Sequence, residues 1–359
     1  MLLKLTKATA MRVLRGAAVD RRMLESTWRQ RRLAILCFHG VSTADEHECF
    51  PTFFTTPQRF REKLELIRRL ELTVLPLNEA VNRLATSTLP KRSVVITLDD
   101  GFHGAYSQGA PVLNEFGYPA TVYMTTHYVL HDRPVFDNMC RYLLWKGSGR
   151  QLKWTDILPA PIILNRDTNP IVIRAIEDYA NGRRLNSFDK DYLLGALAEK
   201  IGIDYQQLRR QRLFHLVNAD EMRSWSNVTF ELHTHRHRVS RNKEAFAELI
   251  DKNRRVLRRI TGRESLHFAY PSGACLPEHP AWLREWGIRS AVTCVPGLAT
   301  PESNPCLLPR IVDSTSLTLQ QLENWLTGVA ALLPTRSYLP DLSQVEPEQE
   351  APRVRAVHA

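Results

Sequence analysis

Eight short runs rich in β-forming residues recur along the chain, and most of them are separated by stretches with helical spacing. Several runs are continuously apolar, which is typical of strands that are covered on both faces in a parallel sheet. Strands that alternate with helices in this way predict an α/β fold, a distorted (β/α) barrel of seven or eight strands rather than an open sheet. The runs are 33–39, 72–77, 93–99, 120–126, 228–235, 266–272, 290–296 and 307–312.

The segments between the runs indicate where the helices and an insertion lie. Segments 57–70 and 243–262 carry apolar residues at helical spacing. The interval between the fourth and fifth runs is much longer than the others, which predicts a largely helical insertion over 130–227 that forms a lid or a side subdomain. We therefore expect one barrel domain over 33–325, followed by a tail (326–359) whose Pro, Glu and Gln content favours partial disorder.

Residues 1–32 hold much of the positive charge of the chain. The formal net charge is +10, and this segment has nine Lys or Arg against Asp20 and Glu25. With Leu and Met interleaved, it could form a basic amphipathic helix that lies on an anionic membrane surface. The alternative is a helix that packs on the domain through its Leu and Met side chains. No recognition motif accompanies the charge, so we do not expect nucleic-acid binding.

The sequence shows no sign of export. No apolar run approaches the roughly 20 residues that a membrane-spanning helix needs. Lysines and arginines interrupt the first segment, which therefore lacks the apolar centre of a secretory signal. The six cysteines form no CxxC pair and no regular framework, which favours reduced thiols. These features predict a cytoplasmic protein, located at the inner face of the membrane if the basic segment binds there.

Charged and metal-ligating residues gather where two of the predicted strands end. Asp99 ends the third run and Asp100 follows it, and the mutual repulsion of these carboxylates calls for a cation nearby. The HTHRH segment at the end of the fifth run holds His233, His235 and His237. Two imidazoles and one carboxylate are a common ligand set for a catalytic zinc ion. Strand alternation pairs His233 with His235, whereas a turn would pair His233 with His237, and spacing alone does not choose.

The motifs ITLDDG and HTHRH resemble the first two motifs of the polysaccharide deacetylases (NodB-homology domain, carbohydrate esterase family 4), written TFDDG and H[ST]xxH. FAYPSG resembles the third motif of that family, and PCLLPRI resembles a late barrel strand. The resemblance covers roughly 33–325 apart from much of the insertion. It implies a metal-dependent hydrolase that removes an N-acyl group, with acetyl expected, from an amino sugar. The sugar would belong to a polysaccharide, an oligosaccharide or a lipid- or nucleotide-linked glycan precursor.

The resemblance also implies roles for individual residues. By the spacing of the second motif, the ligands of a divalent metal are Asp100, His233 and His237, with zinc expected and cobalt, nickel or iron as alternatives. Asp99 would be the general base. The backbone N–H of Ser272, in the YPSG turn, would stabilise the oxyanion.

The general acid cannot come from the position that usually supplies it in this family. The Leu-x-His that usually supplies it is absent from LPRIVDSTSL. The first run, however, ends in LCFHG, which resembles the start of the permuted poly-N-acetylglucosamine deacetylase type, where an amino-terminal His is the acid. His39 is therefore the predicted acid, and the alternative is a core histidine at the end of a buried strand.

Two other family positions differ in this chain. Ala269 stands where the third motif carries an Arg that pairs with the catalytic Asp, so Arg310 is predicted to supply that charge to Asp99, the alternative being a surface arginine. The aromatic residue expected at position 272 is also missing, so we expect a sugar-stacking wall from the insertion, through Tyr142 or Trp145.

A carbohydrate-binding protein that has lost catalysis on the same barrel is the alternative function. The changes in the third motif favour it. The retention of Asp99, Asp100, His233 and His237 favours the hydrolase, because a binding protein has no need of the whole set.

Overall fold

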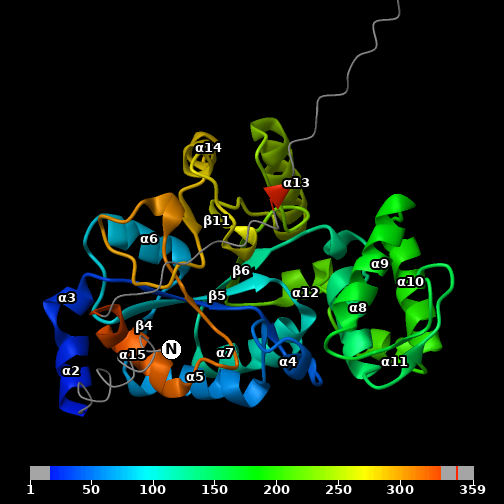
Figure 1. The fold of residues 1–359 in the computed structure, drawn as a ribbon. Helices are drawn as coiled ribbons and strands as arrows, with labels where there is room; N and C mark the ends of the chain where they lie inside the picture. The colour runs from blue at the N-terminus through cyan, green and yellow to red at the C-terminus, as the bar shows by residue number, and fades with distance from the viewer. Residues whose placement is uncertain (1–16, 333–344, 347–359) are drawn as a thin grey trace, which may run out of the picture.

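A barrel of parallel strands forms the centre of the computed structural model, which describes residues 17–332 and 345–346 (Figure 1). The strand order is β12-β11-β9-β6-β5-β1-β13, and β4 pairs with the beginning of β5. Each of the eight runs found in the sequence contains one of these strands, so the predicted α/β barrel is confirmed. The strands are β1 (Ala34–Phe38), β4 (Thr73–Val74), β5 (Ser93–Asp100), β6 (Ala120–Met124), β9 (Val228–Leu232), β11 (His267–Ala269), β12 (Ser290–Val292) and β13 (Ile311–Val312).

The last predicted strand segment joins the two ends of the sheet. Ile311 pairs with Leu36 of β1, while Leu308 forms a parallel bridge with Val292 of β12. One extended segment therefore contacts both the first and the last strand of the sheet order. The sheet is therefore closed into a barrel through this segment.

The strands divide their side chains between two apolar clusters. Ile35, Val95 and Val292 belong to a small cluster that also contains the apolar face of α6 (Leu77–Ala85). Their neighbours in sequence belong to a large cluster with the surrounding helices. Successive strand residues face opposite sides, so the first set lies inside the barrel and the second beneath the helices. Fully buried runs such as β1 need both clusters, which explains why they are continuously apolar.

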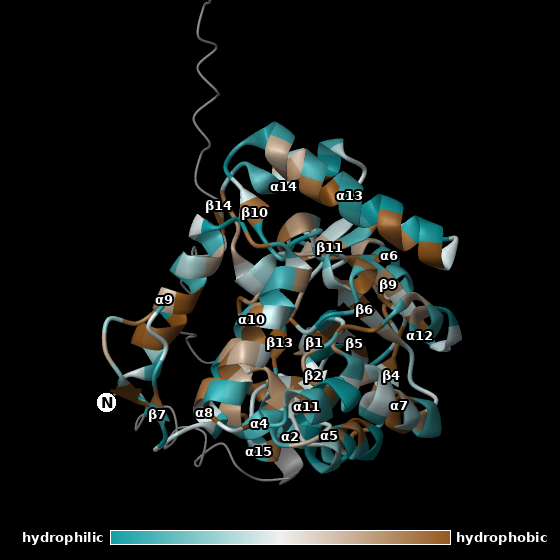
Figure 2. Ribbon diagram, turned by 90° about the vertical axis from the view of Figure 1, so that its right-hand side faces the viewer, coloured by the Kyte–Doolittle hydropathy of each residue, from teal (hydrophilic) through white to brown (hydrophobic). Residues whose placement is uncertain are grey.

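The helices that cover the barrel begin and end at clear sequence signals. The helix predicted over 57–70 is α5 (Pro57–Arg69), where the Thr56 side chain accepts a hydrogen bond from the backbone of Arg59. The helix predicted over 243–262 is α13 (Lys243–Thr261), which ends at Gly262 in the left-handed conformation (φ 69°). Hydrophilic and hydrophobic stripes alternate along α13, because only one side faces the barrel (Figure 2). The others are α7 (Ala110–Phe116), α14 (His279–Glu285) and α15 (Leu319–Thr327).

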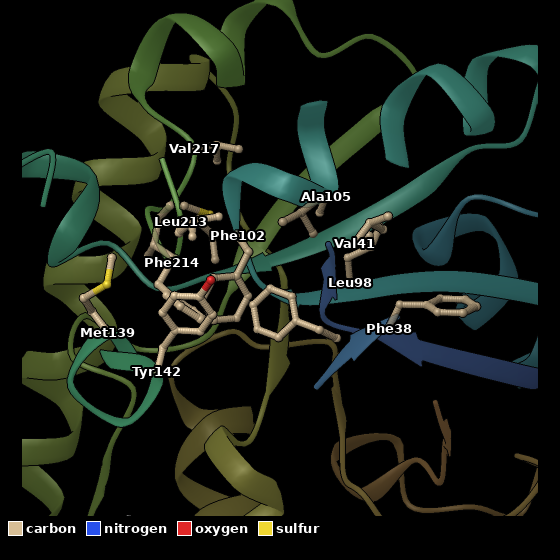
Figure 3. Close-up of a cluster of buried hydrophobic side chains, with 14 of the residues drawn as sticks. Phe38, Val41, Leu98, Phe102, Ala105, Met139, Tyr142, Leu213, Phe214 and Val217 are labelled. Carbon is tan, nitrogen blue, oxygen red and sulfur yellow. The ribbon is translucent and has the colours of Figure 1, made fainter. Parts of the chain in front are cut away.

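The residues of the predicted insertion form a helical unit beside the barrel (Figure 1). Aromatic side chains attach it: the Phe214 ring lies 5.5 Å from Phe54 and 5.3 Å from Tyr142, and Phe102 packs on Phe54 at 4.9 Å. Figure 3 shows Phe102, Tyr142 and Phe214 gathered in this cluster. These four side chains are buried, so the unit is a packed side subdomain. Its elements are α8 (Phe136–Lys146), β7 (Gln151–Leu152), β8 (Ile162–Ile163), α9 (Asn169–Gly182), α10 (Ser187–Lys200), α11 (Tyr205–Arg210) and α12 (Ala219–Ser224).

The described part of the amino-terminal segment packs on the barrel domain. Helices α2 (Ala17–Glu25) and α3 (Thr27–Gln30) lie near α15, and the fully buried Arg29 donates a hydrogen bond to the carbonyl of Leu326 at 2.8 Å. Residues 1–16 of the predicted membrane-binding segment lie outside the described residues. Among the helices that are described, none has the length and apolar character needed to cross a membrane.

Most of the predicted tail also lies outside the described residues. Its short strand β14 (Val345–Glu346) pairs in parallel with β10 (Val239–Ser240). All six cysteines belong to the described part of the chain, and each is a free thiol there.

Candidate active site

Two adjacent carboxylates at the carboxyl end of β5 form the centre of the site. In a regular strand the side chains of Asp99 and Asp100 would point to opposite faces. The backbone of Asp100 is in the left-handed region (φ 68°), which breaks that alternation. The imidazole of His233 consequently lies close enough to lower the pKa of both carboxyl groups. The strand thus delivers two carboxylates to one place at the mouth of the barrel.

Two histidines converge on the second carboxylate. Asp100 Oδ1 lies 3.3 Å from Nε2 of His233 and 3.2 Å from Nε2 of His237. His235 lies elsewhere, with its Nδ1 bonded to Thr126 Oγ1 at 2.9 Å. Thr234 and His237 are both left-handed (φ 61° and 56°), so strand alternation ends before His235. The structure therefore brings His237, rather than His235, to His233.

This cluster fits a divalent cation. The ligand atoms of Asp100, His233 and His237 all lie within 4.8 Å of one another. Asp100 Oδ1 is buried and has no hydrogen-bond partner in the part of the chain that is described. His233 Nδ1 lies 2.7 Å from the carbonyl of Ala269, which can only accept, so Nδ1 carries the proton and Nε2 keeps its lone pair. One carboxylate and two neutral imidazoles are suitable ligands for zinc and its neighbours in the transition series.

Charges within the cluster keep the carboxylate ionised. Burial would raise the pKa of Asp100, but His237 and His233 hold that pKa well below its usual value. Burial would likewise lower the pKa of His237, and Asp100 more than offsets this, so the pKa is raised. The carboxylate is therefore in the form that binds a cation.

A buried asparagine fixes the loop that carries the two histidines. Asn253 of α13 accepts a hydrogen bond from the backbone N–H of His233 at 2.9 Å and donates to the carbonyl of Met124 at 2.9 Å. It also donates to Thr126 Oγ1 at 3.1 Å, and so reaches the partner of His235. Sequence reasoning missed this residue. The available signal was a polar residue on the apolar side of a helix, among Ile250, Val256 and Leu257.

Arg310 holds the first carboxylate from across the barrel. Its Nη1 and Nη2 each donate to one oxygen of Asp99 at 2.7 Å, and its Nε donates to the carbonyl of Thr293 at 2.9 Å. The side chain is fully buried, so the alternative of a surface arginine is wrong. Burial would raise the pKa of Asp99, but the Arg310 guanidinium lowers it below its usual value. Asp99 is therefore an ionised carboxylate in a buried site.

His39 lies directly after β1, beside these carboxylates. A ring nitrogen of His39, an oxygen of Asp99 and the sulfur of Cys37 all lie within 4.8 Å of one another. Its Nδ1 is buried and has no hydrogen-bond partner among the residues described. Burial lowers the pKa of His39, although Asp99 and Asp100 act against this. The ring thus faces the site rather than the apolar core.

Ser272 lies in a turn, η3 (Pro271–Gly273), at the carboxyl end of β11. Its backbone is left-handed (φ 53°), and β11 pairs with the strand that leads to His233. The position at this edge of the barrel is compatible with the oxyanion role, which stays a prediction.

The expected sugar-stacking wall from the insertion is wrong for Tyr142. That side chain is buried, donates a hydrogen bond to Asp45 at 2.6 Å and packs against Phe214. Trp145 lies next to it, with its ring under the ammonium group of Lys146. Tyr142 therefore holds the insertion to the barrel. Trp145 is half-buried, and its sugar-stacking role stays a prediction.

Sequence comparisons match the segment that contains the two carboxylates. A family model described as polysaccharide deacetylase matches residues 86–142. Over 77 residues the chain is 29% identical to a poly-beta-1,6-N-acetyl-D-glucosamine N-deacetylase of Staphylococcus epidermidis. That match covers 21% of this chain and 27% of the relative, so the chain spans about a quarter of the curated relative that it matches.

Solved structures share the fold over most of the chain. The Streptococcus pyogenes deacetylase PplD, solved in complex with acetate, has a TM-score of 0.55 and 15% identity, over 82% of this chain and 98% of its own. IcaB from Ammonifex degensii has a TM-score of 0.52 and 17% identity, over 83% of this chain and 97% of its own. At these identities the likeness concerns the fold.

Proposed function

We propose that the chain is a polysaccharide deacetylase, a metal-dependent hydrolase that removes the N-acetyl group from an amino sugar of a glycan. The observation that carries this proposal is the convergence of two separate sets of residues. Asp99 is paired with Arg310, and Asp100 lies with His233 and His237 on the adjoining side. A protein that only binds sugars has no use for an ionised, buried carboxylate beside a metal-binding cluster.

Each residue of the site has a chemical role in this reaction. A divalent cation held by Asp100, His233 and His237, with zinc the best fit, would polarise the acyl carbonyl and acidify a water molecule. Asp99, kept ionised by Arg310, accepts a proton from the attacking water. The C–N bond breaks as His39 donates a proton to the leaving amine, which yields acetate and a free amino sugar. The backbone N–H of Ser272 donates to the oxygen that becomes negative during the attack.

The first experiment combines elemental analysis with an acetate-release assay on N-acetylated glycans, before and after chelation. Poly-β-1,6-N-acetylglucosamine, named as the substrate of the Staphylococcus epidermidis relative, is the first polymer to test. We expect one bound divalent metal and acetate release that stops on chelation and returns with metal. A protein that binds no metal even after reconstitution would overturn the proposal.

Asp99→Asn separates the hydrolase from a binding protein. We expect kcat to fall by about 10²- to 10⁴-fold, as for loss of a general base, while bound metal and glycan affinity persist. The matched control is Asp220→Asn, whose side chain is 94% exposed on α12, and it should keep full activity. Unchanged acetate release in Asp99→Asn would exclude Asp99 as the base.

A further inference from the structure

A phenylalanine ring lies exposed against the proposed general acid. Phe53 is 45% exposed, whereas the next residue, Phe54, is 2% exposed. The Phe53 ring meets the His39 ring edge-on, with 5.3 Å between the centroids and 82° between the planes. Phe53 therefore forms part of the surface at the mouth of the site, on the side of His39.

Hydrogen bonds fix the backbone of Phe53 beside His39. Strand β2 (Gly40–Val41), just after His39, pairs with β3 (Phe54–Thr55). The N–H of Gly40 donates to the carbonyl of Phe53 at 2.9 Å, and the N–H of Phe53 donates to the carbonyl of Phe50 at 3.1 Å. Successive residues face opposite sides, so Phe54 enters the aromatic cluster under the insertion while Phe53 points outward. Exposure of Phe53 thus follows from the fold.

We propose that Phe53 is a binding platform for the apolar face of the sugar ring that carries the leaving amine. The inference rests on the proposed function. The amine that His39 protonates is bonded directly to that sugar ring, so the ring must lie within reach of His39. One face of a pyranose consists largely of C–H groups, and an aromatic ring covers such a face well. Phe53 would supply the aromatic surface that position 272 lacks.

The proposal assigns Phe53 to one half of the substrate only. The acetyl group would lie over Asp100, His233 and His237, while the sugar would lie over Phe53 and His39. Loss of the ring should therefore weaken binding of the sugar and leave binding of acetate unchanged. It should also leave the chemical step intact, because Phe53 carries no group that exchanges protons.

The test compares Phe53→Ala with wild type on the tetramer of N-acetylglucosamine. We expect KM to rise about tenfold, as for the loss of one stacked ring, with kcat within about twofold. The inhibition constant of the deacetylated tetramer should rise in parallel, and that of acetate should not change. Phe53→Trp should restore KM, whereas Phe53→Leu, which keeps apolar bulk without a flat ring, should not. Phe188→Ala, which removes another exposed phenylalanine, is the matched control with unchanged KM.

Several outcomes would overturn the assignment. A fall in kcat at constant KM, or a shifted pH profile, would mean that Phe53 acts only by positioning His39. An equal rise in KM for Phe188→Ala, or full recovery in Phe53→Leu, would exclude a stacking platform at Phe53. Wild-type protein that releases no acetate would overturn the proposed function as well, whereas active wild type with an unaffected Phe53→Ala would overturn this inference alone.

Discussion

At the scale of single residues, a buried ion pair keeps a carboxylate of the site ionised. Arg310 and Asp99 are both buried and joined by two hydrogen bonds of 2.7 Å, so neither charge is solvated by water. Such a pair tolerates the removal of one partner poorly, since the other charge is then buried alone.

Arg310→Gln should therefore lower the free energy of unfolding by about 3–5 kcal/mol, measured by urea denaturation. Arg83→Gln, which breaks the exposed ion pair between Arg83 and Glu79, should cost less than about 1 kcal/mol. If Arg310→Gln lowered the free energy of unfolding as little as this control does, Asp99 would have to be hydrated or protonated when Arg310 is absent.

Asn253 acts on the site through the backbone of His233, a proposed metal ligand. Asn253→Ala removes the acceptor for the N–H of His233 and the donor to Met124, and should lower metal affinity about 10- to 100-fold. The measurement is the dissociation constant of zinc, from competition with a chelator. Asn181→Ala, on the exposed end of α9, is the control. An unstable variant with unchanged metal affinity would mean that Asn253 serves the fold alone.

At the scale of residues, the sequence predicted the site residues that belong to recognisable motifs. It did not predict a residue such as Asn253, which supports the motif residues but belongs to no motif. Asp99, Asp100 and the histidines are adjacent to strand ends, where a barrel gathers chemistry. The choice of His237 over His235 depends on left-handed backbone at Thr234 and His237, which periodicity does not report. Asn253 is distant in sequence from everything that it binds, so only the folded structure identifies it.

At the scale of elements, a glycine allows β2 and β3 to lie together beside the site. The Phe54 ring packs so closely on Gly40 that a Cβ there would overlap it. Gly40→Ala should therefore cost about 1–3 kcal/mol of stability, as overpacking in a core does. Gly182→Ala on α9, where a Cβ meets nothing within 4 Å, should be neutral or slightly stabilising. Equal melting temperatures for the two variants would show that the Phe54 ring moves aside freely.

Element positions followed from the sequence better than element lengths. The run at 72–77 becomes the two-residue strand β4, because β6 takes over the same side of β5 three residues further on. The pairs β2–β3 and β10–β14 have only two residues in each strand, too few to produce a hydrophobic pattern. Their formation depends on partners that are far away in the chain.

At the scale of the whole molecule, buried histidines make stability depend on pH. Burial lowers the pKa of His267 from 6.5 to about 4, and its Nδ1 is bonded to Ser290 Oγ at 2.8 Å. Between these two pKa values the unfolded chain binds a proton that the folded protein does not, so stability falls as pH decreases from about 6.5 toward 4. The contribution of this one group is about 3 kcal/mol.

His267→Gln should reveal this contribution. The variant should be less stable than wild type at pH 7.5, because it loses packing and the Ser290 contact, and the difference should shrink by about 2–3 kcal/mol at pH 4.5. Urea denaturation at the two pH values measures both differences. A difference that stays constant with pH would show that His267 does not titrate between the two states in this range.

At the scale of the whole molecule, the contacts that attach the insertion to the barrel could not be predicted from the sequence. The length and helical pattern of 130–227 indicate an added unit but not its contacts. Those contacts come from rings such as Phe54, Phe102 and Phe214, which belong to three separate segments and carry no shared motif. Tyr142 was expected at a sugar surface for this reason, although it is a packing residue.

The segment that closes the barrel also sets the order in which parts of the protein can fold during synthesis. Asp99 and Arg310 are separated by 211 positions along the chain, and Arg310 belongs to the last strand segment that joins the sheet. During synthesis the carboxylate emerges from the ribosome long before its counter-ion. A partly made chain that buried Asp99 would hold an uncompensated charge, which opposes early closure around the site. The ion pair of Asp99, the proposed general base, and the closed barrel are therefore completed by the same late event, so an incomplete chain has neither.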